Sequence, residues 1–123
     1  MRAHDLQAVM RREPDFTSPD GDASFWMLGG FGEGMAWVGR FRGTSPWERH
    51  AAGHEVLHQL EGEVDVTVVG DEGPETTRLQ SGSVFIVPPD RWHRVSSTDE
   101  VVMWGVTAGR TEHHEGETPP AAG

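Results

Sequence analysis

Two short stretches of this chain carry side chains that could bind a divalent metal. They are residues 48–55 and residues 88–93, and each borders a run of strand-forming residues. Their candidate ligands are two imidazoles and two carboxylates, namely Glu48, His50, Glu55 and His93. Imidazole and carboxylate are ligands that Zn, Fe(II), Mn and Ni accept. Two imidazoles and one carboxylate on one face of an iron ion also form the triad of non-haem oxygenases.

The first stretch has a regular internal spacing. Four residues separate His50 from Glu55, six more separate Glu55 from Gly62, and Glu48 stands two positions before His50. This order resembles the first motif of the cupin superfamily, which runs His-x-His, three or four residues, Glu, six residues and Gly. Glu48 takes the place of the first His of that motif.

The second stretch matches the second cupin motif, which runs Gly, five residues, Pro-x-Gly, two residues, His, three residues and Asn. Gly82, Pro88 and His93 fall in register with it. Asp90 replaces the inner Gly, and Ser97 replaces the Asn. Two motifs in the right order make the resemblance fairly specific for the fold.

The resemblance covers roughly residues 43–107 and implies an all-β fold, a double-stranded β-helix or jelly-roll barrel. It implies that His50, Glu55 and His93 bind one divalent metal ion inside the barrel, with Fe, Mn, Ni and Zn as candidates. We expect Glu48 as a fourth ligand, and the alternative is an ordinary surface carboxylate. Two His and two carboxylates would favour Mn or Fe over Cu.

Five further side chains are expected to line a substrate pocket beside the ligands, and they are Gln59, Arg91, Trp47, Trp92 and Trp104. Gln59 shares a strand face with Glu55 because side chains alternate along a strand, whereas His54 and His58 would face the other way. Arg91 could pair with a substrate carboxylate. The indole rings would favour a flat or apolar ligand, and packing in the core is the alternative for each.

The strand pattern of the chain supports an all-β fold independently. Residues 64–68 alternate between apolar and polar, residues 70–74 read as a turn, and residues 76–79 return as a hairpin partner. Residues 84–87 are continuously apolar, so we expect a strand that is buried on both faces. Eight or more short strands with this rhythm indicate a β-sandwich or a jelly-roll barrel.

The expected organisation is a single domain with short extensions. Residues 1–24 would form an N-terminal arm, residues 25–108 the barrel, and residues 109–123, rich in Glu, Pro and Ala, a disordered flexible tail. Within the arm, residues 5–12 have the spacing of a short helix that Pro14 would end, and an extended arm is the alternative.

Composition excludes several classes of function. A net charge of −10 over 123 residues argues against nucleic acid and against anionic membrane surfaces. Without Cys there is no disulfide and no thiolate zinc site, and without Lys and Tyr there is no Schiff base and no phenolic acid. No apolar run has the length of a membrane span and no signal pattern opens the chain, so we expect a cytoplasmic protein. Lys and Asn, whose codons are AT-rich, are absent, so we expect the chain to come from a GC-rich bacterial genome.

The resemblance implies a metal-dependent dioxygenase or isomerase that acts on a small organic molecule. The octapeptide from Glu55 to Gly62 is similar to the equivalent stretch of the 3-hydroxyanthranilate dioxygenase type. A non-enzymatic module that binds or senses a small molecule is the alternative, and a structural dimer with a vestigial site is a third reading. We also expect a homodimer, since two-fold dimers are the commonest assemblies.

Overall fold

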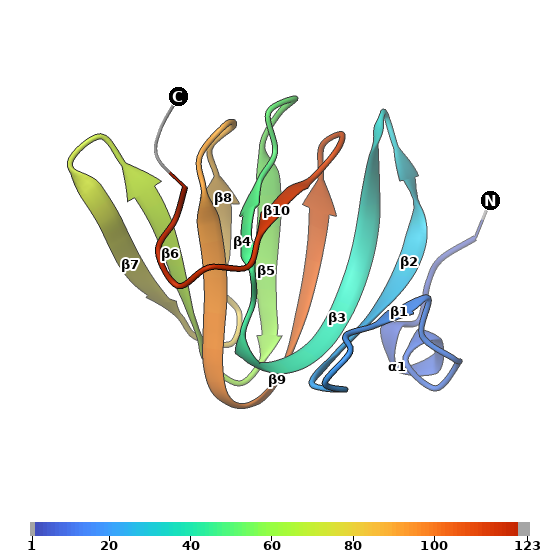
Figure 1. Cartoon of the computed structure of the whole chain (residues 1–123). Helices are drawn as coiled ribbons and strands as arrows, with labels where there is room; N and C mark the ends of the chain where they lie inside the picture. Colours follow the sequence, from blue (N-terminus) through green and yellow to red (C-terminus); the bar gives the residue numbers. More distant parts are fainter. Residues whose placement is uncertain (1, 121–123) are drawn as a thin grey trace.

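The computed structural model describes residues 2–120, and within them antiparallel strands form a strongly curled sheet (Figure 1). The elements in chain order are α1 Leu6–Val9, β1 Phe16–Thr17, β2 Ala23–Phe31, β3 Gly34–Thr44, β4 Trp47–Arg49, β5 Glu55–Glu61, β6 Val64–Gly70, β7 Gly73–Leu79, β8 Val84–Val87, β9 His93–Thr107 and β10 Glu112–His114. The expectation of an all-β barrel of the jelly-roll type is confirmed.

Strand β9 joins the two halves of the sheet. Its C-terminal half lies between β3 and β5, with Gly105 in register with Trp37 on one side and with Leu57 on the other. Its N-terminal half pairs with β6, where Val95 is the partner of Val66. Residues 94–97 and 101–107 are two strand-like runs in the sequence, but they form one continuous strand, because β9 pairs with β6 over its N-terminal half and with β3 and β5 over its C-terminal half.

The inward faces of the strands enclose the main hydrophobic core. Side chains along β5 alternate as a half-buried strand requires, so Glu55, Leu57 and Gln59 are buried. The buried apolar members of this core are Phe41, Leu57, Val64, Val66, Leu79, Val87, Val101 and Met103. Glu55 therefore enters the barrel interior on the same face as core residues.

A second, smaller core lies on the outer face of the sheet, under the N-terminal segment. Asp5 is the N-cap that precedes helix α1, and its side chain accepts hydrogen bonds from the backbone of the first turn. Val9 and Met10 pack with Trp26, Val38 and Val102. The helix expected over residues 5–12 is confirmed in part, because only Leu6–Val9 is helical.

Strand β8 differs from the sequence prediction of a strand buried on both faces. Val84 is 57% exposed and Ile86 is 50% exposed, while Val87 is fully buried. In the described part of the chain β8 pairs only with β5, and its outward side chains are left uncovered. The continuous apolar run therefore predicted burial of both faces of this strand, but only one face is buried.

The C-terminal segment also differs from the expected flexible tail over 109–123. Strand β10 pairs with β4, and residues Glu112, His113 and His114 are in register with Arg49, Glu48 and Trp47. In Figure 1 this segment runs in red across the open side of the sheet, from β10 toward β6 and β8. The predicted tail therefore includes a strand, and residues 121–123 lie outside the described part of the chain.

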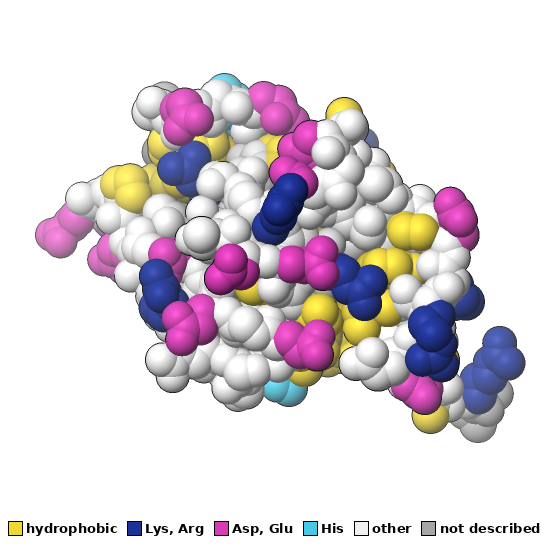
Figure 2. Space-filling model, turned by 90° about the horizontal axis from the view of Figure 1, so that it is seen from below, with side chains coloured by type: hydrophobic (Ala, Val, Ile, Leu, Met, Phe, Trp, Pro, Cys, Tyr) yellow, Lys and Arg dark blue, Asp and Glu magenta, His cyan; other side chains and the backbone are white. Residues whose placement is uncertain are grey.

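Charged side chains are scattered over one face of the molecule. Figure 2 shows carboxylates spread over the face seen from below, interrupted by arginines and a few apolar side chains. None of the helical structure described in residues 2–120 is long and apolar enough to traverse a bilayer.

Candidate metal centre and its cavity

Three side chains from different elements converge inside the barrel. Glu55 opens β5, His93 opens β9, and His50 directly follows β4. Each is at most 5% exposed, and their ligand atoms all lie within 4.8 Å of one another. These are three of the four residues that the resemblance to the cupin motifs implies as ligands. A buried set of two imidazoles and one carboxylate could hold a metal ion.

The Glu55 carboxylate lies between the two imidazoles. Its Oε1 atom is 3.2 Å from His93 Nε2, its Oε2 atom is 3.3 Å from His50 Nε2, and the two ring centroids are 4.9 Å apart. The approach of His50 to Glu55 does not have hydrogen-bond geometry, and His50 Nε2 is buried with no hydrogen-bond partner. A buried polar atom without a partner is costly, so these residues fit a metal ion that would supply one.

Neighbouring groups orient both imidazoles. His93 Nδ1 lies 3.1 Å from the carbonyl oxygen of Arg91, and His50 Nδ1 lies 3.0 Å from Thr111 Oγ1. Because a carbonyl can only accept a hydrogen bond, the proton of His93 sits on Nδ1. In the neutral ring this leaves the lone pair of Nε2 for the centre, which is the arrangement that metal-binding histidines use.

A hydrogen-bonded chain orients the carboxylate. The Thr107 hydroxyl donates a hydrogen bond to Glu55 Oε2, and Trp37 Nε1 donates to Thr107 Oγ1 at 2.9 Å. Thr107 ends β9 and is in register with Glu55 on one side and with Met35 of β3 on the other. Thr107 and Trp37 were missed by the sequence analysis, although strand alternation around Trp37 could have placed its ring inside the barrel.

Electrostatics hold the centre in an ionised state. Burial would raise the pKa of the Glu55 carboxyl, but the adjacent imidazoles of His50 and His93 outweigh burial and lower it to about 2. Burial would lower the pKa of His93, but the hydrogen bond to Glu55 and its negative charge raise it above 6.5. Without a metal the group therefore favours a carboxylate beside an imidazolium, and a metal ion would displace that proton.

Glu48 does not join this group. Its Oε2 atom lies 3.2 Å from His113 Nε2 of β10, and this carboxylate raises the pKa of His113. Glu48 is nevertheless in register with His93 and lines the same cavity. Within residues 2–120, the group that could hold a metal contains three residues, and a ligand role for Glu48 stays a prediction.

A cavity of about 960 Å³ opens from the metal group. Its wall includes aromatic side chains of β2 and β3, among them Phe25, Trp37 and Phe41. The C-terminal segment contributes Thr111, His113 and residues 115–117. These wall residues could not be predicted from the sequence, because they come together only where distant strands and the C-terminal segment meet.

The predicted pocket residues Gln59 and Arg91 lie elsewhere. Gln59 is fully buried, but its Nε2 atom donates to the carbonyl oxygens of Glu61 and Gly62 at 2.8 and 3.0 Å. It thus stabilises the turn after β5. Arg91 points outward and donates to Asp71 at 2.8 Å. Neither residue lines the cavity that the described chain encloses.

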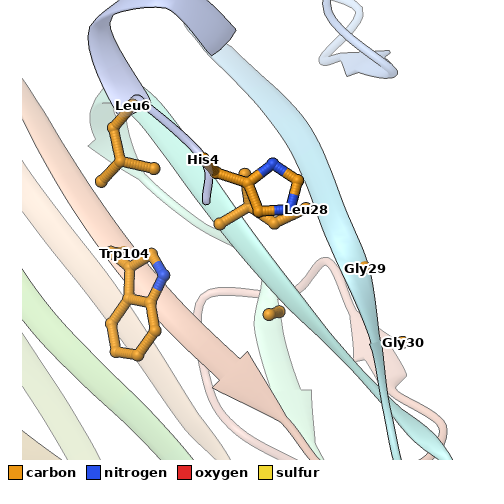
Figure 3. A pocket seen from close by; sticks show the side chains of 7 residues that line it. His4, Leu6, Leu28, Gly29, Gly30 and Trp104 are labelled. Atoms are coloured by element: carbon orange, nitrogen blue, oxygen red, sulfur yellow. The ribbon is translucent and has the colours of Figure 1, made fainter. Parts of the chain in front are cut away.

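The three predicted tryptophans also lie outside the cavity lining. Trp47 is buried, and its Nε1 atom donates to the carbonyl of Glu117, which ties the C-terminal segment to β4. Trp92 lies 4.7 Å under the Arg49 guanidinium. Trp104 faces outward into a separate hollow of about 380 Å³ beside the N-terminal segment (Figure 3). His58, which we expected to face away from the ligands, packs against the Trp104 ring.

Comparisons with known proteins show what this chain is similar to. No curated protein sequence matches it significantly. A cupin-like protein from Thermotoga maritima is similar in structure, with a TM-score of 0.72 at 20% identity over 87% of this chain and 89% of that one. A cupin-2 domain protein from Shewanella frigidimarina has a TM-score of 0.60 at 19% identity, over 69% of this chain and 79% of that one.

The Mn(II)-containing oxalate decarboxylase of Bacillus subtilis has a TM-score of 0.70 at 15% identity over 85% of this chain. This chain spans only 30% of the length of that enzyme, so the likeness concerns the fold. The family model of the cupin domain matches residues 41–109, which is more than half of the chain and includes both motifs. The chain therefore belongs to the cupin family.

Proposed function

We propose that this protein is a metal-dependent cupin in which His50, Glu55 and His93 hold one divalent ion. The observation that carries the proposal is their buried convergence, together with the partnerless Nε2 atom of His50. The fixed tautomer of His93 and the hydrogen bond from Thr107 to Glu55 support it, because outer partners of this kind orient metal ligands. Mn, Fe, Ni and Zn are the candidate ions.

We propose further that the bound ion serves a dioxygenase or isomerase reaction on a small organic molecule. A divalent ion on two imidazoles and one carboxylate supplies Lewis-acid or redox chemistry. The protein contributes a carboxylate held in place through Thr107 and Trp37, and a cavity that opens from the metal group and has aromatic side chains in its wall. His113 and Glu48, paired at 3.2 Å, close part of the wall of that cavity.

Elemental analysis and oxygen uptake test the two steps separately. The protein loaded with Mn, Fe(II), Ni or Zn should retain about one equivalent of metal per chain after desalting. Oxygen consumption with a panel of catechols and aminophenols should then identify a dioxygenase, and substrate isomerisation without oxygen uptake an isomerase. Metal retention with neither activity would replace the enzyme proposal with a binding or sensing module. Failure to retain any metal would mean a vestigial site.

We also propose that the chain forms a two-fold dimer through the outer face of the sheet. Val84 and Ile86 are exposed there, and their cross-strand partners His58 and Val56 belong to the same face. Light scattering should report twice the chain mass for the wild type and a monomer for Ile86→Glu. The substitution Val69→Glu, at a partly exposed site on β6, is the control and should leave the dimer intact.

A further inference from the structure

The cavity beside the metal group has an aromatic shelf built by two strands. The ring of Phe25 lies 5.7 Å from that of Trp37 in an edge-on arrangement and 6.3 Å from that of Phe41 in a stacked one. All three side chains line the cavity. Aromatic rings in such geometry present a continuous apolar surface on which a flat ligand can pack.

Two glycines provide the room for this shelf. Gly39 is in register with Phe25, and a β-carbon on Gly39 would collide with the Phe25 ring. Gly105 is in register with Trp37, and a β-carbon there would collide with the Trp37 indole. Each ring therefore lies across a neighbouring strand. The shelf is linked to the metal group through the hydrogen bonds from Trp37 to Thr107 and from Thr107 to Glu55.

The charge of the cavity is predominantly negative. Its carboxylates are Asp20, Asp22, Glu48, Glu55, Glu115 and Glu117. In the described chain only Arg42 and Arg94 line it with a permanent positive charge. A divalent ion on the metal group would reduce the excess of negative charge without reversing it, even with His113 protonated.

Both arginines are already engaged by other groups. Arg42 Nε lies 3.1 Å from Asp22 Oδ1 in an ion pair. The Arg94 guanidinium lies 4.5 Å over the Trp47 ring and donates to the carbonyl of Glu117. A carboxylate ligand would therefore have to displace one of these contacts to gain a guanidinium partner.

We infer that the site takes a small aromatic molecule that carries a positive charge or none, and that it disfavours carboxylates. The aromatic shelf packs against the ring of the ligand, and the surrounding acids attract an ammonium group, which aromatic faces also favour. This inference rests on the proposed function, since it concerns the ligand of the same cavity. It separates this protein from a site built for a dicarboxylate such as oxalate.

Three probes that share a phenylethyl or benzyl body but differ in charge test the inference: 2-phenylethylamine, 2-phenylethanol and phenylacetate. Calorimetric titration of the full chain, both metal-free and Mn-loaded, should rank the amine first and phenylacetate last, with about a tenfold difference in Kd. Oxalate, titrated alongside, should bind more weakly than the amine. Tighter binding of phenylacetate or oxalate than of the amine in either form would overturn the inference. So would the absence of binding by any ring probe up to about millimolar concentration.

Two substitutions test whether the preference for the amine over phenylacetate arises in this cavity. Asp22→Asn should free Arg42 and move the preference toward phenylacetate, reducing the amine advantage about threefold or more. Glu63→Gln is the matched control, because Glu63 is also a carboxylate paired with an exposed arginine, Arg78, but lies outside the cavity. Equal effects of the two substitutions would contradict the assignment to this cavity.

Metal content, measured on the same samples, keeps the two proposals distinguishable. A protein that binds no metal but ranks the probes as expected would refute the metal proposal and retain the inference. A protein that binds metal and prefers phenylacetate would refute the inference alone.

Discussion

The substitution Glu55→Gln isolates the electrostatic energy of the metal group in the metal-free protein. The fall of the Glu55 pKa from 4.5 to about 2 corresponds to about 3 kcal/mol of stability that requires the ionised carboxylate. That contribution is fully present above pH 4.5 and is lost as the pH falls toward 2. Glutamine has nearly the same shape and can still accept the hydrogen bond from Thr107, so this pH-dependent part is what the substitution removes.

The titration of His93 sets the upper pH limit of the stability that the ionised Glu55 contributes. Its pKa is raised from 6.5 by Glu55, so its contribution is fully present below pH 6.5 and is lost as the pH rises through the raised value. The two shifts describe one interaction and are not added together. The stability of the wild type minus that of Glu55→Gln should therefore be largest between about pH 4.5 and 6.5 and should decrease on both sides.

Urea unfolding followed by tryptophan fluorescence, in the presence of a chelator and between pH 3 and 8, measures this difference. The exposed carboxylate of Glu63 provides the control, and Glu63→Gln should show a pH dependence below about 1 kcal/mol. A difference between wild type and Glu55→Gln that is flat across this range would refute the electrostatic reasoning for the group.

Three further predictions concern the metal and the walls of the cavity. His93→Ala should abolish metal retention in elemental analysis, whereas His113→Ala should leave about one equivalent bound; the reverse result would move the site to the C-terminal segment. Glu48→His should raise the affinity for Ni relative to Mn in competition titrations, and unchanged selectivity would remove Glu48 from the ligands. Gly105→Ala should cost about 1–3 kcal/mol in denaturant unfolding because its methyl group would collide with the Trp37 ring and with the backbone carbonyl of Val56; an unchanged midpoint would contradict this packing argument.

The sequence was informative where the signal is local. Strand alternation predicts that Glu55 and Gln59 share the inner face of one strand, and both are buried there. The resemblance to the two cupin motifs implies that His50, Glu55 and His93 act together, and the structure brings their ligand atoms within 4.8 Å of one another. Strand alternation is a short-range constraint that a single sequence contains, whereas the meeting of the two motifs was inferred from the family resemblance.

Long-range partners could not be predicted in the same way. Glu48 pairs with His113, and the partner comes from a strand near the end of the chain that composition alone described as a tail. Trp47 and Trp92 sit beside the predicted ligands in sequence, but their rings pack against Arg94 and Arg49. Sequence proximity to a ligand therefore did not predict which aromatic rings line the cavity, since that depends on the register between strands.

The topology of β9 has a consequence for how the chain folds during synthesis. Strands β3, β5 and β6 each need a part of β9 as a neighbour, and β9 ends only at Thr107. While the ribosome is still making the preceding residues, these strands have unsatisfied edges that could pair with other chains. We therefore expect cooperative folding late in translation, with nascent chains that end before β9 binding to chaperones and released full-length chains folding as one unit.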